Sequence, residues 1–249
     1  MSSPAPKKLG VFDFETTGTC VETDRIVTAF VGTLDADGAV LDGQEWMIRP
    51  DGYVISDGAA AIHGITTDRA IAEGRPFAEV LPEIVEALVT LSRLGVPVVA
   101  HNASYDFTML AHEMARAGFI DPPSLIDPID IIDTFVLDKQ VDKYRRGSRT
   151  LTATAAVYGV ELSDEEAHGA QADAIAAGRI ALVILSRPDF NNMPCDKLQQ
   201  LQKGWAREQR ASLQAYKRSQ GDAGFTVELD WPLYASALAL REPEEVYTF

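Results

Sequence analysis

Two carboxylates stand two residues apart near the start of the chain, in the segment Asp13-Phe14-Glu15. The apolar residues before them predict a β-strand, and side chains two positions apart on a strand project from the same face. Asp13 and Glu15 therefore project together, whereas Phe14 turns into the core. Adjacent carboxylates repel each other unless a cation lies between them, and their hard oxygen atoms suit Mg²⁺ or Mn²⁺. Taken alone, the pair is more typical of an acidic strand end in solvent.

A third carboxylate, Asp106, follows the apolar segment VPVVAH and stands two residues after Ser104, the expected N-cap of a helix. Open α/β sheets bind their ligands beyond the carboxyl ends of the strands, and this is where the pattern places Asp106. An acidic residue in a first helical turn is also ordinary, because it interacts favourably with the helix dipole.

His168 and Asp173 stand five residues apart in the segment EAHGAQADAIAAG. On one helix this spacing would point the two side chains well away from each other. Gly169 indicates instead that His168 lies in a loop and Asp173 in the first turns of a helix. The histidine can then swing over a site whose floor includes Asp173. A single histidine beside an acidic loop is more commonly a surface residue, so only the complete set of residues favours catalysis.

The segments around these residues predict a layered α/β fold. Three consecutive antiparallel strands are expected, at residues 8–18, 25–35 and 39–50. Short strands at 96–102 and 130–135 then alternate with helices at 76–95, 104–118, 150–160 and 169–187. This order indicates a mixed five-stranded sheet flanked by helices.

The residue composition changes after Arg187, where prolines and asparagines predict a linker. A helix is expected over residues 196–222, and the last residues add a strand or simply pack. We therefore predict one domain at 1–187 and a C-terminal helical extension at 188–249. The helix carries six basic residues: Lys197, Lys203, Arg207, Arg210, Lys217 and Arg218. A solvated basic face explains them better than a dedicated nucleic-acid arm.

Composition narrows the class of protein. Of the 249 residues, 46% are hydrophobic and 24% are charged, which is typical of a soluble globular protein with a core. We expect no membrane span, because no apolar run is long enough, and no secretion signal follows the first residues. Cys20 and Cys195 are too few for a disulfide scaffold and too far apart for a zinc site, so we expect reduced thiols in a cytoplasmic protein.

Five residues in FDFETTG, HNASYDFTML and AHGAQAD together resemble the DEDDh family of 3′→5′ exonucleases: Asp13, Glu15, Asp106, His168 and Asp173. This DnaQ-like family has the ribonuclease H-like fold. The resemblance runs from about residue 8 to residue 186 and includes Ile62-His63-Gly64-Ile65-Thr66, similar to a substrate-side segment of the family. Residues 188–249 carry no pattern of the family.

The resemblance implies two divalent cations, Mg²⁺ or Mn²⁺, and hydrolysis of a phosphodiester bond at a 3′ end. Asp13, Glu15 and Asp173 would hold one cation, and Asp13 would also contact a second, which Asp106 supports. His168 would deprotonate the attacking water, since an imidazole titrates near neutral pH. The product would be a nucleoside 5′-monophosphate.

Substrate contacts are expected near both strand ends. The backbone at Thr16, Thr17 and Gly18 is placed to cradle the terminal nucleotide. Further residues match family positions near the terminal base and sugar: Phe14, His63, His101, Asn102 and Phe107. His101 and Asn102 are equally expected to satisfy backbone groups at a strand end. Arg145 and Arg146, in the basic segment KYRRGSR, are expected to contact phosphate.

Several alternatives stay open. We expect the 3′ end of single-stranded DNA as substrate in proofreading, repair or processing, but RNA 3′ ends and short oligoribonucleotides fit the same motifs. A non-catalytic docking module is disfavoured because all five residue types are present. A polymerase or repair partner bound through the C-terminal helix also fits. The net charge of −15 predicts weak, salt-sensitive binding to nucleic acid outside the active site.

Overall fold

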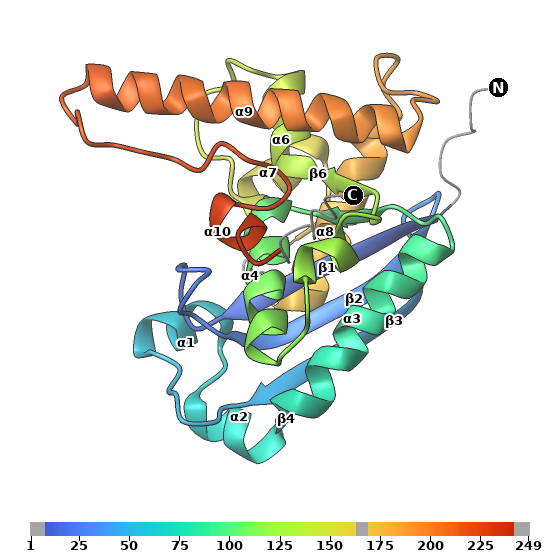
Figure 1. Cartoon of the computed structure of the whole chain (residues 1–249). Helices are drawn as coiled ribbons and strands as arrows, with labels where there is room; N and C mark the ends of the chain where they lie inside the picture. The colour runs from blue at the N-terminus through green and yellow to red at the C-terminus, as the bar shows by residue number, and fades with distance from the viewer. Residues whose placement is uncertain (1–7, 163–168, 242–249) are drawn as a thin grey trace, which may run out of the picture.

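A computed structural model describes residues 8–162 and 169–241, which form a mixed β-sheet with helices on both faces (Figure 1). The strand order is β4-β3-β2-β1-β5-β6. Three long strands, β1 (Lys8–Thr16), β2 (Ile26–Asp35) and β3 (Val40–Arg49), are consecutive and antiparallel. The short strands β5 (Val98–Ala100) and β6 (Ile131–Asp133) run parallel to β1. The predicted mixed sheet is confirmed.

One strand was not anticipated. The two-residue strand β4 (Arg75–Pro76) pairs with Ile48 and Arg49 at the end of β3, giving the sheet six strands where five were expected. A two-residue strand has no alternation from which it can be recognised. Pro76 also cannot donate to a ladder, which restricts such a strand to a sheet edge.

Each face of the sheet carries its own apolar core. On one face, Phe12 and Phe14 of β1 pack with α3 (Phe77–Arg93) and α4 (Ala103–Arg116). On the other face, Leu9 and Val11 of β1 pack with α6 (Thr134–Val141), α7 (Leu151–Tyr158) and α8 (Ala170–Leu185). The alternation of the β1 side chains thus serves both layers, and the same alternation sends Asp13 and Glu15 to the α8 face.

Helix α8 approaches β1 and β2 closely because its inward face consists of small residues. A Cβ atom at Gly178 would touch Val11 Cγ1 and would lie 2.6 Å from Leu34 Cδ1. Such distances leave no room for a side chain, so glycine is required by packing rather than by backbone conformation. The close approach fixes the position of Asp173, one turn into the same helix.

The start of α4 differs from expectation. Its N-cap is Asn102, in the left-handed conformation with φ 68°, rather than Ser104. Ser104 lies inside the first turn, is fully buried and accepts a hydrogen bond from Arg210 at 2.8 Å. The tight turn after β5 therefore starts the helix two residues earlier than the cap preference of serine suggests.

The C-terminal helix α9 (Cys195–Ser219) covers the edge strand β6. Gln199 Oε1 accepts from Ile131 N at 2.7 Å, and Gln202 Oε1 accepts from Asp133 N at 2.7 Å. Gln202 Nε2 donates to Ile131 O at 2.9 Å. Two side-chain amides thus replace the hydrogen bonds that a further strand would make.

After α9 the chain returns to the short helix α10 (Ala235–Leu238), which contacts α4 (Figure 1). Trp231 is buried in the α4 core, and Tyr234 N donates to Thr108 Oγ1 at 3.0 Å. The last described residues pack and add no strand. None of the described helices combines the length and apolar character needed to cross a bilayer. The division at residue 187 stays a prediction.

Three further short helices had no clear periodic signal: α1 (Asp57–His63), α2 (Thr67–Glu73) and α5 (Pro122–Ile126). Each has five to seven residues, which is too few to display a repeat of 3.6. Side-chain caps support them instead, since Ser56 Oγ accepts from Ala59 N and Thr66 Oγ1 accepts from Arg69 N.

Candidate active site

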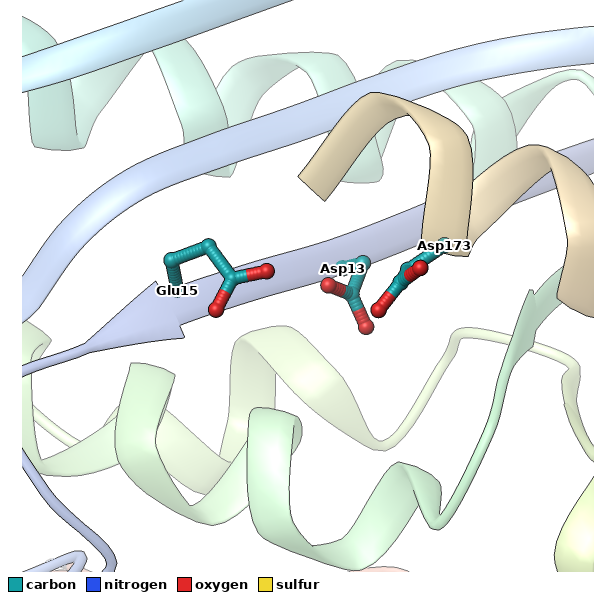
Figure 2. Close-up of side chains that lie close together, drawn as sticks. All are labelled: Asp13, Glu15 and Asp173. Atoms are coloured by element: carbon teal, nitrogen blue, oxygen red, sulfur yellow. The ribbon is translucent and has the colours of Figure 1, made fainter. Parts of the chain in front are cut away.

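Three carboxylates meet where β1 passes the first turn of α8. One oxygen each of Asp13, Glu15 and Asp173 lies within 4.8 Å of the others (Figure 2). Asp13 and Glu15 project from the same face of β1, as the alternation predicted, and Asp173 faces them from the helix. The predicted convergence of these three residues is confirmed, across 160 positions of sequence between the first and the last.

The electrostatics of this cluster favour a bound cation. Burial, followed by the charges of Asp106, Asp173 and Glu15, raises the pKa of Asp13 well above its ordinary value. Burial and the charge of Asp173 raise the pKa of Glu15 to about 7. Carboxylates that resist ionisation in this way are stabilised as anions when a divalent cation binds between them. The donor set, three hard oxygen ligands, fits Mg²⁺ or Mn²⁺.

Asp106 lies beside this cluster and outside the group of three. Its side chain is buried on α4, and burial raises its pKa, with the charges of Asp133 and Glu15 acting in the same direction. Hydrogen bonds from its own backbone and that of Phe14 oppose the rise. Because Asp106 also raises the pKa of Asp13, the two carboxylates share one electrostatic environment.

A cavity of about 300 Å³ opens next to Glu15 and is lined by residues of β2 and β3. His63, Ile65 and Gly169 are among its lining residues. His63 ends α1, where Gly64 adopts φ 73° as the C-cap, and His63 Nδ1 accepts from Ile65 N at 3.1 Å. The neutral ring therefore carries its proton on Nε2. His168 lies outside the described residues and is the sequence neighbour of Gly169.

The turn after β1 is fixed by a residue that the sequence analysis missed, Tyr105. Its hydroxyl donates to Gly18 O at 2.6 Å and lies 2.7 Å from Thr16 Oγ1. On the far side of the turn, Thr17 Oγ1 donates to Asp24 Oδ1 at 3.1 Å. Tyr105 immediately precedes Asp106, so one helical turn positions both a carboxylate and the Thr16–Gly18 backbone.

Both ring nitrogens of His101 contact polar groups of the protein. Its Nδ1 lies 2.8 Å from Thr134 Oγ1 and its Nε2 lies 3.1 Å from Arg149 O. Of the two expectations for this residue, satisfying polar groups at a strand end is the one that the geometry supports. Asn102 N donates to Asp133 Oδ1 at 3.1 Å, which holds the left-handed turn before α4.

Two of the expected substrate contacts have their side chains in the core. Phe14 is 6% exposed and Phe107 is fully buried. Phe12 packs between them, with ring centroids 4.6 Å from Phe14 and 5.3 Å from Phe107. Both side chains help to hold β1 and α4 together, and a role of either residue in binding the terminal nucleotide stays a prediction.

Two arginines of the basic segment form ion pairs inside the protein. Arg145 is 11% exposed in its side chain and pairs with the buried Asp138 at 2.7 Å. Arg149 binds the same carboxylate at 2.5 Å. The charge of Arg145 is therefore paired with a carboxylate inside the protein, and its assignment as a phosphate contact stays a prediction. Arg146 is exposed, and its assignment stays a prediction.

Residues 11–181 match the protein family RNase_T, described as exonuclease. The chain is 25% identical over 195 residues to the 3′-5′ exonuclease DinG of Bacillus subtilis (strain 168), covering 78% of this chain and 19% of that protein. It is 27% identical over 186 residues to ribonuclease T of Shewanella frigidimarina (strain NCIMB 400), covering 71% of this chain and 81% of that protein.

Solved structures of exonuclease I share the fold. One has a TM-score of 0.64 at 21% identity, covering 83% of this chain and 46% of that chain. Escherichia coli exonuclease I in complex with a dT13 oligonucleotide has a TM-score of 0.61 at 22% identity, covering 74% of this chain and 42% of that chain. The chain thus spans less than half of exonuclease I. Because the family match covers most of this chain and contains the acidic cluster, the protein belongs to the DEDDh exonuclease family.

Proposed function

We propose that the protein is a metal-dependent 3′→5′ exonuclease that releases nucleoside 5′-monophosphates from single-stranded DNA. The observation that carries this proposal is the convergence of the Asp13, Glu15 and Asp173 carboxylates within 4.8 Å, with Asp106 beside them. Burial first, and then the charges of neighbouring carboxylates, raise the pKa values of Asp13 and Glu15, and such perturbed pKa values are concentrated at functional sites.

Asp13, Glu15 and Asp173 would hold one divalent cation, and Asp13 together with Asp106 would serve a second. When bound, two such cations supply the positive charge that stabilises the attacking and leaving oxygens of an in-line phosphoryl displacement. Asp13 lies on β1 and Asp173 on α8, and the close packing of α8 against β1 at Gly178 holds the two carboxylates near each other.

His168 would take the proton from the attacking water. It is the sequence neighbour of Gly169, which lines the same cavity as Glu15. The His63 ring and the Thr16–Gly18 backbone would hold the terminal nucleotide on the same side. Tyr105 would support that backbone through its hydrogen bond to Gly18 O.

Support for DNA comes from the similarity to Escherichia coli exonuclease I, which has been solved with a single-stranded dT13 oligonucleotide. A specific observation also favours RNA as a second candidate, since the relative named ribonuclease T is matched over 81% of its length. A role in proofreading, repair or processing is part of the proposal, as is work in the cytoplasm, where both cysteines, free in the structure, would stay reduced.

Partner binding would use the outer face of α9. Leu213 is 40% exposed and Tyr216 is 60% exposed there, which is consistent with docking to a polymerase or repair protein. Affinity capture with the whole chain tests this: Leu213→Asp with Tyr216→Asp should release the captured polymerase or repair protein. Capture that is unchanged by both substitutions would remove α9 from any such interface.

The test of the activity is a time course on 5′-labelled single-stranded DNA and RNA of one sequence, with Mg²⁺, with Mn²⁺ and with EDTA. A ladder that shortens from the 3′ end and is abolished by EDTA supports the proposal, and the ratio of rates chooses the substrate. Asp13→Asn should abolish both activity and metal binding. The matched control, Asp37→Asn, removes an exposed carboxylate from a turn and should keep the wild-type rate. A folded wild-type protein that degrades neither strand would refute the proposal.

A further inference from the structure

Three cations gather at the carboxyl ends of β5 and β6 in a protein whose net charge is −15. They are Lys139 of α6, Arg149 of the following loop and Arg210 of α9. Arg149 is paired with Asp138. Lys139 and Arg210 make no ion pair among the described residues. We call these two residues the cation pair.

Arg210 is the one basic residue of α9 that binds at the start of α4. Its Nη2 donates to Ser104 Oγ at 2.8 Å, two residues before Asp106, and its Nη1 donates to the backbone oxygen of Asp230. Its guanidinium carbon lies 5.5 Å from the centroid of the Tyr234 ring. These partners are neutral groups, so Arg210 is oriented by them and is not ion-paired with a carboxylate among the described residues.

Lys139 is held differently, by an aromatic surface. Its Nζ lies 4.6 Å from the centroid of Phe135, and the Phe135 ring also packs edge-on against His101 at 5.7 Å. Its amine makes no hydrogen bond within the described part of the chain. Burial and then the charges of Arg149 and Arg210 lower the pKa of Lys139, and the smaller effects of the Asp133 and Asp138 carboxylates oppose them. The repulsion from each arginine therefore exceeds the attraction of either carboxylate. An anion between them would relieve the repulsion.

The cation pair lies at the same edge of the sheet as the acidic cluster. Strands β1 and β5 are parallel, and Val11 lies opposite Val99. Two residues further along in each case, Asp13 and His101 therefore lie at the same level along the strand direction. The cavity beside His63 lies on the β2–β3 side of Asp13, whereas the cation pair lies on the β6 side. A strand whose 3′ nucleotide occupies the cavity and whose scissile phosphate reaches the carboxylates would continue toward Lys139 and Arg210.

We propose that Lys139 and Arg210 form a phosphate-binding subsite for the substrate strand, upstream of the scissile bond. This inference rests on the proposed function and assigns the C-terminal helix a part in binding the substrate. Arginine suits a phosphate oxygen pair with its planar fork, and a lysine ammonium adds a point charge. Contact with phosphate is independent of sequence, as an exonuclease requires.

The test compares oligonucleotides of increasing length, from a dinucleotide upward, with the p-nitrophenyl ester of thymidine 5′-monophosphate. The ester carries the scissile phosphate and no other, so it reports the chemistry alone. The quantity measured is kcat/KM for each oligonucleotide divided by kcat/KM for the ester. In wild type this ratio should rise at the length that first places a phosphate in the subsite. In Lys139→Gln the increase of this ratio with length should be about tenfold smaller than in wild type, which is the size of one contact between charged groups.

Arg210 also bonds to both Ser104 and Asp230, so its loss could disturb packing as well as charge. Arg210→Gln is therefore compared with a second variant, Arg210→Lys, which keeps the charge. Partial recovery by lysine separates charge from packing. Lys203→Gln is the matched control, because Lys203 is exposed on the same helix and its loss changes the net charge equally. Its ratio should equal that of wild type. The slope of log KM against log salt should fall by about 0.7 in Lys139→Gln and stay unchanged in Lys203→Gln.

A methylphosphonate placed at single linkages locates the contact. In wild type, a methylphosphonate at one linkage should lower the cleavage rate by about tenfold. In Lys139→Gln the same methylphosphonate should leave the rate unchanged. If Lys139→Gln keeps the wild-type length profile, or if the methylphosphonate effect persists in it, the subsite is refuted while the exonuclease stands. If wild type cleaves neither the ester nor any oligonucleotide, the proposed function itself has failed.

Discussion

Trp231 donates its indole N–H to Asp133 Oδ2 at 3.0 Å, so a residue near the C-terminus is bonded to the end of strand β6. Both side chains are buried. The other oxygen of Asp133 accepts from Asn102 N and from the first amides of α6. One carboxylate thus joins the C-terminal segment to the turn that starts α4 and, through it, to Asp106.

Replacing Trp231 by phenylalanine should lower the free energy of unfolding by about 1–3 kcal/mol, because a buried carboxylate oxygen loses its donor. It should also lower kcat/KM, since the Asn102 turn loosens. Urea denaturation and the exonuclease assay measure the two effects. Trp205→Phe is the control, because the Trp205 ring packs against Phe190, with centroids 6.1 Å apart, and donates no hydrogen bond to Asp133. Equal losses in the two variants would show that ring volume alone matters.

Gln202→Ala should expose the edge strand to solvent. The substitution removes the partners of Asp133 N and Ile131 O, two backbone groups in a fully buried setting. Each unsatisfied group costs about 1–3 kcal/mol unless water reaches it. Hydrogen exchange at the Asp133 amide should accelerate. Gln200→Ala, at an exposed position of the same helix, should change stability by less than about 0.5 kcal/mol. Similar exchange in both variants would contradict the role of Gln202.

Gly178→Ala and Gly204→Ala should have opposite effects. At Gly178 the new methyl group meets Val11 and Leu34, so α8 must move and overpacking costs about 1–3 kcal/mol. Because Asp173 is on the same helix, metal affinity should fall as well. At Gly204 no atom lies within 4 Å, and alanine should stabilise α9 by about 0.5–1 kcal/mol. Thermal unfolding and Mn²⁺ titration measure both. A Gly178→Ala protein with wild-type stability would disprove the close approach.

The stability of the metal-free protein should fall as pH rises. Folded Glu15 keeps its proton up to a pKa of about 7, whereas the ordinary value is 4.5. Between these values the folded state binds the extra proton, so the cost of ionising Glu15 is absent below 4.5 and complete above about 7. Unfolding temperatures in EDTA between about pH 5 and about pH 8 should show this fall, and excess Mg²⁺ should remove it.

Glu15→Gln serves as the control for that pH dependence, because the amide has no proton to release in this range. Its unfolding temperature in EDTA should fall less than that of wild type over the same range of pH. A wild-type curve and a Glu15→Gln curve that run parallel would assign the pH dependence to other groups.

The strand and the helix that carry the acidic cluster were predicted well because their signals are local. Alternation along β1 places Asp13 and Glu15 on one face, and the glycine before α8 places Asp173 in a first turn. The same local logic failed for Ser104, where a left-handed turn at Asn102 overrides the usual preference for serine as an N-cap.

Long-range partners could not be predicted from local patterns. The segment KYRRGSR was expected to contact phosphate, and its ion pairs with Asp138 of the preceding helix, through Arg145 and Arg149, were not anticipated. In the same way, Arg210 looked like one of six equivalent basic residues, and only the fold shows that it reaches Ser104. The alternation along β1 did predict that Phe14 turns into the core, whereas the complete burial of Phe107 depends on packing between distant segments.

The short pairing of β4 leaves the two edges of the sheet unlike each other. Strand β4 covers only Ile48 and Arg49, so among the described residues the outer edge of β3 from Val40 to Glu45 has no strand beside it. Val40 and Leu41 are 45% and 55% exposed there, next to the acidic Asp42 and Glu45. An unpaired edge invites strand exchange between molecules, and charged residues oppose it. Colloidal stability of the protein should therefore depend on the carboxylates of Asp42 and Glu45, and acid or high salt should promote its self-association through β3.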